Sequence, residues 1–134
     1  MKIYHLLCAA AFFSLSVFAA QAQNQPLSPE EQEKRILEYV DARTQKLSNL
    51  LELEYWQEFY VDSTLTHDIK AMWEESSKMQ AAKVENRDLF IAVEDKWEQQ
   101  IDDSFKRFFT EEQWKKYWKS GAERAWKARQ KRKK

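Results

Sequence analysis

The sequence of 134 residues contains very few residues that interrupt helices. It has one glycine, Gly121, and two prolines, Pro26 and Pro29, which precede or open the first expected helix. Nothing in residues 30–134 shows the alternation and turn residues that are typical of strands. The remaining composition, rich in Glu, Lys, Gln, Ala and Leu, favours helices. We therefore predict an all-α protein of about four helices, an elongated helical hairpin or bundle with one long central helix.

Side chains for catalysis and metal binding are also scarce. Cys8 is the only cysteine, and His67 is the only histidine in residues 23–134. This excludes two-histidine and cysteine zinc sites from those residues, together with Ser-His-Asp and Cys-His catalytic arrangements. His67, Met72 and Met79 are a conceivable soft-metal site for copper, but their spacing is loose, and methionines on a helix face usually pack in a core. One glycine excludes a Gly-rich phosphate loop. We expect no enzyme activity, no cofactor and no metal.

The first 22 residues have the three-part pattern of a secretory signal peptide. Lys2 supplies a positive charge, residues 6–20 are an almost unbroken apolar run, and Ala20-Gln21-Ala22 is a cleavage signal of the small-x-small type. The run is shorter than the roughly 20 residues that span a membrane. Cys8 lies inside the run, whereas a lipoprotein cysteine follows it. We predict cleavage near Ala22 and a periplasmic or secreted mature protein, held without disulfides by its core alone.

Helix start signals divide the rest of the chain. Ser28, Pro29 and Glu31 combine a capping box with a proline at the first helical position. Asn86 is a second cap. The expected helices run from Pro29 to a weak break at Ser48-Asn49, where the chain bends or continues, and over about 50–82, 86–108 and 111–130. The third carries a single apolar stripe, formed by Phe90, Val93, Trp97, Ile101, Phe105 and Phe108.

The central expected helix, residues 50–82, has apolar side chains on two sides. Leu53, Trp56, Tyr60, Ser63 and His67 lie along one side, and Leu47, Leu50, Val61, Leu65, Met72, Ser76 and Met79 lie nearer the other. A helix on a protein surface shows one stripe. Two stripes indicate a helix that is covered on two sides, kinked near residues 62–68, or in contact with a second chain. The first and third interpretations are favoured.

The strongest local signal begins at Thr110. Thr110 and Gln113 have capping-box spacing, and Glu111 and Glu112 place negative charge in the first turn. Trp114, Tyr117 and Trp118 then share one helix face. We predict that a helix starts here and buries a large aromatic surface.

The sequence is rich in tryptophan, with six. Core packing explains most such residues, but an exposed apolar surface for a partner is the sharper hypothesis. The candidate partner-binding residues are Trp56, Phe59, Tyr60, Trp73 and Trp126. We expect Trp73 and Trp126 to be the most exposed, because each lies beside the main stripe of its helix.

Charge is segregated along the chain. Residues 23–120 contain 14 basic and 21 acidic side chains, a net charge of −7, whereas residues 121–134 contain seven basic and one acidic, a net charge of +6. We predict one helical domain over residues 23–126 and a basic tail over residues 127–134. The tail is either a frayed, solvated end or a site for anionic surfaces. The candidate residues are Lys127, Arg129, Lys131, Arg132, Lys133 and Lys134.

The segment Phe109-Thr110-Glu111-Glu112-Gln113 resembles the Leu-Thr-x-x-Gln signature of the Spy/CpxP periplasmic proteins. Residues 53–57 resemble a degraded first copy, 56 residues earlier. The resemblance implies an elongated helical protein, often an antiparallel dimer, acting as an ATP-independent chaperone, stress-signalling modulator or metal sensor. Two features depart from the family. The body is acidic where the family's cradle is basic, and Glu54 replaces threonine, so that the first helix start is expected to be lost.

The resulting expectation is an exported, non-enzymatic helical binding protein, of chaperone or stress-response type. Its expected partners are unfolded or partner polypeptides, a second copy in a homodimer, or an anionic envelope surface, and no nucleic acid. The alternative function is attachment to anionic envelope surfaces through the basic tail.

Overall fold

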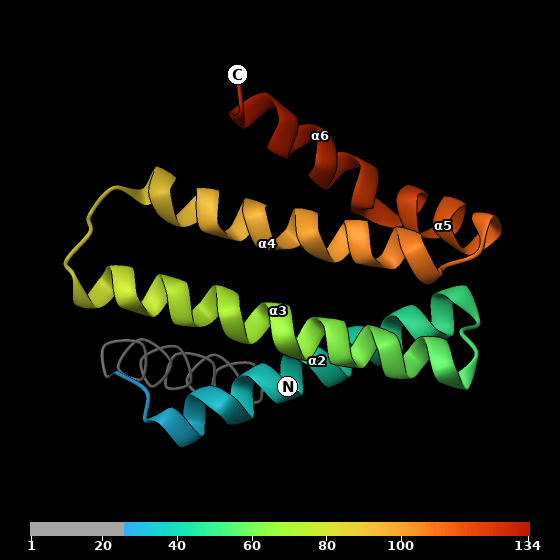
Figure 1. Ribbon diagram of the computed structural model, residues 1–134, viewed down its shortest axis with the longest axis horizontal. Coiled ribbons are helices and arrows are strands. Elements are labelled where there is room, and N and C mark those ends of the chain that lie inside the picture. The colour runs from blue at the N-terminus through green and yellow to red at the C-terminus, as the bar shows by residue number, and fades with distance from the viewer. Residues whose placement is uncertain (1–25) are drawn as a thin grey trace, which may run out of the picture. The chain divides into compact units, whose positions relative to one another are not determined.

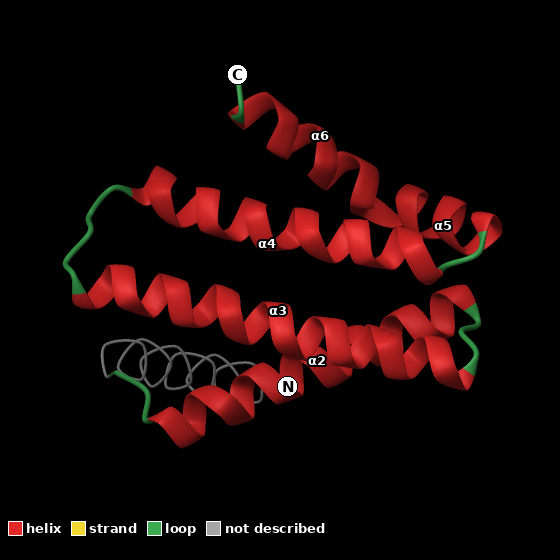
Figure 2. Ribbon diagram, viewed as in Figure 1, coloured by secondary structure: helices red, strands yellow, loops and turns green. Residues whose placement is uncertain are grey.

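The computed structural model describes residues 26–134, which are helical apart from short turns (Figures 1 and 2). The helices are α2 (Pro29–Leu51), α3 (Tyr55–Ala81), α4 (Arg87–Phe108), α5 (Glu111–Tyr117), the π-helix η1 (Trp118–Ala122) and α6 (Glu123–Arg132). The described part of the chain contains no strand, and the all-α prediction is confirmed for it. Residues 33–134 form one compact unit. The expected signal peptide, residues 1–22, lies outside the described residues.

The predicted start of α2 is confirmed. The Glu31 amide donates to Oγ of Ser28 at 3.2 Å, and the Ser28 amide donates to Oε2 of Glu31 at 3.0 Å. The weak break at Ser48-Asn49 does not interrupt α2, which continues to Leu51. Its end is marked by Glu52, whose positive φ of 51° is incompatible with a continuing right-handed helix.

The expected single helix over residues 50–82 is therefore wrong at its start. Residues 50 and 51 belong to α2, a turn occupies residues 52–54, and α3 begins at Tyr55. The predicted start of α4 is correct, because Oδ1 of Asn86 accepts a hydrogen bond from the Asp88 amide at 3.0 Å. Asn86 thus satisfies one of the amides that the first turn leaves without an intrahelical partner.

The core is formed by one apolar stripe from each of α2, α3 and α4, closed at one end by residues of the α5 region. Its buried members are Ile36, Val40, Leu47, Leu51, Val61, Leu65, Ile69, Ile101, Phe105, Phe109, Tyr117 and Ala122. The two apolar stripes predicted for the central helix thus differ in burial. Val61 and Leu65 are fully buried, whereas Trp56 and Tyr60 on the other side remain about half exposed, at 47% and 52%.

The expected fourth helix is divided at Gly121. This residue has a φ of +135° inside η1, a conformation that L side chains rarely adopt. Beyond it, α6 runs back along α4 (Figure 1), and ion pairs join the two helices. Residues 127–132 belong to α6. The predicted boundary between the domain and a separate tail at residue 126 therefore falls within a helix.

Candidate functional site

Two helix starts form the frame of the candidate site. At α5, Oγ1 of Thr110 accepts from the Gln113 amide at 3.2 Å, and Oε1 of Gln113 accepts from the Thr110 amide at 2.9 Å, as predicted. At α3, Oε1 of Gln57 accepts from the Glu54 amide at 3.0 Å in the same way. The expectation that Glu54 abolishes this helix start is wrong. Glu54 adopts the extended backbone of a cap, with φ −69° and ψ 158°, and the glutamine half of the box needs no threonine hydroxyl.

The two glutamines also bind each other. Nε2 of Gln57 donates to Oε1 of Gln113 at 2.7 Å, and Nε2 of Gln113 donates to Oε1 of Gln57 at 3.0 Å. Each amide additionally donates to the last residue of the helix before the other motif. Gln57 reaches the Phe108 carbonyl at 3.0 Å, and Gln113 reaches the Leu51 carbonyl at 3.3 Å. One pair of side chains therefore links the ends of α2 and α4 with the starts of α3 and α5.

An exposed group of aromatic side chains lies beside this link. It comprises Tyr55, Trp56, Phe59 and Tyr60 on the first turns of α3, together with Phe108 at the end of α4, and we refer to it as the aromatic surface. The four residues on α3 are all exposed, Tyr55 at 89% and Phe59 at 64% of its surface. The rings are in contact, with centroid distances of 6.1 Å for Trp56–Tyr60 and 5.9 Å for Tyr60–Phe108.

A groove of about 440 Å³ lies along one side of the aromatic surface. It is lined by Trp56, Gln57, Tyr60, Arg107, Phe108, Phe109 and Thr110. Its aromatic lining offers contacts to apolar side chains, and Arg107 and the Thr110 hydroxyl add polar groups. The indole of Trp56 is also held in place, because its Nε1 donates to Oε2 of Glu54 at 2.6 Å. The arrangement suits the capture of apolar side chains by a rigid aromatic wall.

The other two candidate tryptophans lie elsewhere. Trp73 is half-buried and packs against the core. Trp126 is half-buried and lies 5.8 Å from Trp118, which in turn lies 5.6 Å from Trp114. The expectation that Trp73 and Trp126 are the most exposed tryptophans is wrong, because Trp56 has the largest exposed fraction of the six, 47%. For Trp126 the reason is the change of backbone direction at Gly121, which an ideal helical repeat does not include.

Some basic residues of α6 form ion pairs within the molecule. Arg129 is buried and forms an ion pair with Asp102 of α4. Asp102 also accepts a hydrogen bond from the Tyr117 hydroxyl at 2.6 Å. Burial, with the adjacent Asp102 carboxylate, raises the pKa of Tyr117 well above its ordinary value. The prediction that Arg129 faces an anionic surface is therefore wrong. Sequence reasoning had only the net charge of the segment and no sign that α6 lies on α4.

The remaining candidates of α6 differ in their pairing. Arg132 pairs with Asp95 at 2.7 Å, and Lys127 pairs with Glu123 one turn earlier at 2.6 Å. Lys131, Lys133 and Lys134 are exposed and carry no ion pair in the described structure. Three of the six candidate cations are thus open to an external partner.

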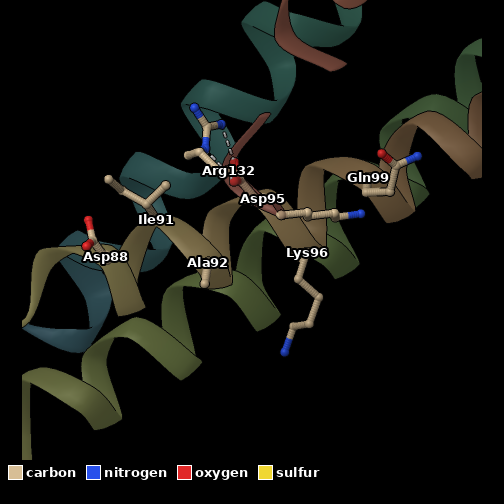
Figure 3. A pocket seen from close by; sticks show the side chains of 8 residues that line it. Asp88, Ile91, Ala92, Asp95, Lys96, Gln99 and Arg132 are labelled. Carbon is tan, nitrogen blue, oxygen red and sulfur yellow. Dashed lines mark hydrogen bonds and ion pairs between the residues drawn. The ribbon is translucent and has the colours of Figure 1, made fainter. Parts of the chain in front are cut away.

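A second hollow lies between α4 and α6 and has a volume of about 560 Å³ (Figure 3). Its lining is formed by Asp88, Ile91, Ala92, Asp95, Lys96, Gln99, Arg132 and Lys133. Figure 3 shows Arg132 reaching across to Asp95, and Lys96 pairs with Glu75 of α3 at 2.6 Å. Most of its charged groups are satisfied internally, so that the hollow offers less to a ligand than the aromatic surface does.

Within residues 26–134, no group of three or more His, Cys, Asp and Glu side chains is placed to hold a metal ion. In the same part of the chain, no helix has the length and apolar character that crossing a membrane requires. Comparison of the chain with family models, curated proteins and solved structures found no match.

Proposed function

We propose that this protein binds partner or partly unfolded polypeptides through the aromatic surface, without ATP and without catalysis. The observation that carries the proposal is the exposure of Tyr55, Trp56, Phe59 and Tyr60 on consecutive turns of α3, while the opposite stripe closes a complete core. Contiguous exposed apolar surface is typical of sites of protein interaction. Tryptophan and tyrosine also contribute most to binding where they are central to an interface.

Preorganisation supports the same proposal. Trp56 is fixed by its hydrogen bond to Glu54, and the start of α3 is fixed by Gln57. Side chains that are already ordered lose little conformational freedom on binding, which lowers the cost of association. The resemblance of residues 109–113 and 53–57 to the Spy/CpxP signature points to the same class of function.

The proposed setting is the periplasm or the exterior, after removal of residues 1–22. Mass spectrometry of the exported protein is expected to give a first residue of Gln23. Recovery of the protein in the cytoplasm with Met1 retained would refute this setting.

The test of the function is suppression of aggregation, followed by light scattering of a denatured substrate at equal concentration. Wild type is expected to suppress scattering, and the double variant Trp56→Ala, Tyr60→Ala is expected to lose this ability while remaining helical. The matched control is Leu37→Ala, Leu89→Ala, which removes side chains of similar exposure, 45% and 49%, outside the aromatic surface. Equal loss in both double variants, or no suppression by wild type, would refute the proposal.

A second candidate function is attachment to anionic envelope surfaces. The observation that favours it is the group of three exposed lysines at the end of α6, Lys131, Lys133 and Lys134, which have no internal ion pair. Each contributes about 1 kcal/mol near an anionic lipid surface. Retention on anionic vesicles is expected to fall at high salt and to disappear when the three lysines are replaced by glutamine. Retention that is unaffected by both changes would exclude this function.

A further inference from the structure

The part of the chain that carries most of the aromatic surface is rich in carboxylates. Residues 52–62 contain four acidic side chains and no lysine or arginine. Glu52, Glu54 and Asp62 are exposed, and Glu58 is half-buried. Two further acids, Glu111 and Glu112, directly follow Thr110, which lines the groove.

Several of these carboxylates have no cationic partner. The side chains of Glu58 and Asp62 form neither a hydrogen bond nor an ion pair with any described residue, and those of Glu111 and Glu112 likewise lack an ion pair. Further along α3 the exposed acidic side chains are paired with lysines, and Asp68 is buried. Glu74 pairs with Lys78 at 2.8 Å, and Glu75 pairs with Lys96 at 2.6 Å. Exposed, unpaired negative charge on α3 is therefore concentrated at the end that carries the aromatic surface.

Few cations offset this charge. Of the acids in residues 52–62 and 106–113, Glu52 alone has an ion pair in the described structure, with Lys116 at 4.0 Å. Residues 52–62 and 106–113 together contain six acidic and two basic side chains. The ammonium of Lys106 lies over the Trp114 ring, at 5.7 Å from its centroid. Arg107 lines the groove and donates to Oγ of Ser104 at 3.1 Å. Arg107 is the one cation lining the groove. The open carboxylates of Glu58 and Asp62 lie on another side of α3, three residues after Tyr55 and Phe59 respectively, and therefore beside those two rings.

We infer that the aromatic surface selects cationic amphipathic polypeptide segments, in which lysine or arginine alternates with apolar side chains. This inference rests on the proposed function and specifies its ligand. The apolar side chains of such a segment occupy the groove beside Trp56 and Tyr60. Its lysine and arginine stems lie along the aromatic rings. On the side of α3 that carries Tyr55 and Phe59, their charged ends meet the ring faces and the carboxylates of Glu58 and Asp62, each three residues after one of those rings.

The competing occupant is a second copy of this chain. The most basic helix of the chain, α6, is already packed on α4, because Arg129 and Arg132 pair with Asp102 and Asp95. At the end of α6 a second copy still offers Lys131, Lys133 and Lys134, but residues 130–134 contain no apolar side chain that could enter the groove with them. Charge complementarity consequently favours an external basic segment over self-association.

The experiment compares two synthetic peptides that share one apolar helical pattern and differ in having lysine or glutamate at every polar position. Binding to the full chain is followed by isothermal titration calorimetry at low and high salt. At low salt, the lysine peptide is expected to bind at least roughly tenfold more tightly than the glutamate peptide. This preference is expected to decrease at high salt, which screens the carboxylates.

The variant Glu58→Gln, Asp62→Asn is expected to lose most of the preference while still binding both peptides. The matched control is Glu85→Gln, Glu94→Gln, which removes the same charge from exposed acids without an ion pair outside the aromatic surface. This control is expected to keep the preference. Equal loss in both variants would overturn the inference, because the preference would then follow net charge.

The remaining outcomes separate this inference from the proposed function. Equal binding of both peptides that is lost in Trp56→Ala would overturn the charge preference and leave the proposed function standing. Binding of neither peptide, together with a dimer in analytical ultracentrifugation that Trp56→Ala dissociates, would overturn both, since a second copy would then cover the surface.

Discussion

Gln57 and Gln113 stand 56 residues apart in the chain and exchange hydrogen bonds through their side-chain amides, at 2.7 and 3.0 Å. Each also accepts from the backbone amide at the start of its own helix and donates to the end of a helix from the other half of the chain. The turn from α2 to α3 and the turn from α4 to α5 are thereby joined. The aromatic surface lies beside this link, so the arrangement of its side chains depends on both turns.

Replacing either glutamine is expected to destabilise the whole unit. Gln113→Ala removes both hydrogen bonds that its side chain shares with the buried Gln57 amide, and the one that it accepts from the exposed Thr110 amide. A buried group left unsatisfied costs about 1–3 kcal/mol. A double-mutant cycle with Gln57→Ala, measured by urea unfolding, is expected to show strong coupling between the two sites. Gln80→Ala, at an exposed position of α3, is the control and is expected to change stability by less than about 0.5 kcal/mol. If the losses of stability in Gln57→Ala and Gln113→Ala are additive, the two glutamines are not coupled, and the proposed link between the two turns is wrong.

The buried ion pair between Arg129 and Asp102 is expected to hold α6 on α4. Arg129→Ala leaves a buried carboxylate without its cation and is expected to cost about 3–5 kcal/mol. The control is Lys127→Ala, which breaks the solvent-exposed pair with Glu123 and is expected to change stability by at most about 0.5 kcal/mol. Thermal unfolding of both variants tests the difference. Similar small losses would mean that apolar contacts alone hold α6 in place.

Stability is expected to decrease in alkaline solution because of Tyr117. Its pKa is raised in the folded protein above the ordinary value of 10.0, so the neutral phenol is favoured by folding. The corresponding stability is fully present below pH 10.0 and is lost as the pH rises from there towards the folded pKa. The expected slope is about 1.4 kcal/mol per pH unit.

The measurement is the unfolding free energy of wild type and Tyr117→Phe between about pH 8 and pH 11, a range that spans ordinary tyrosine ionisation. Tyr117→Phe is expected to be less stable at the lower pH, because Asp102 loses a hydrogen bond, and to show a shallower alkaline decline. The control, Tyr55→Phe, alters a ring that is 89% exposed and is expected to keep the decline of wild type. Identical slopes in all three proteins would show that Tyr117 is not the group responsible.

Core and surface aromatics are expected to differ sharply in their effect on stability. Phe105 is fully buried and contacts the rings of Phe108, Phe109 and Tyr117, so Phe105→Ala is expected to cost about 3–5 kcal/mol. Trp56→Ala is expected to cost about 1 kcal/mol or less, since its ring is about half exposed and its main polar contact is local. Chemical denaturation measures both. A large loss for Trp56→Ala would indicate that this residue serves the fold more than a partner.

Local sequence rules located much of this structure. The capping boxes at Ser28 and Thr110 and the cap at Asn86 all form as predicted, because each depends on side chains within three residues of the backbone that they satisfy. The apolar stripe of α4 is correct at its centre for the same reason. Ile101 and Phe105 are buried by a periodicity that the sequence displays directly.

The features that were missed depend on contacts between distant residues. The hydrogen bonds between Gln57 and Gln113 were not predicted from the sequence. The repeat of the motif at residues 53–57 and 109–113 was the one signal that could have indicated them. Nothing near Arg129 indicated that Asp102 would neutralise it, because their meeting requires the reversal of direction at Gly121. The break after Leu51 was missed because Glu52 and Glu54 are ordinary helical residues by propensity, and the tertiary link through Gln57 overrides that preference.

The series of indoles from Trp114 through Trp118 to Trp126 crosses the point where the backbone turns at Gly121. Aromatic chromophores this close exchange excitation energy, and their circular dichroism depends on the relative orientation of the rings. The first two belong to the segment before the turn and the third to α6, so the optical coupling between Trp118 and Trp126 exists only while α6 keeps its present course. The protein therefore contains an intrinsic spectroscopic reporter for the position of its last helix, which can be read without attaching a label.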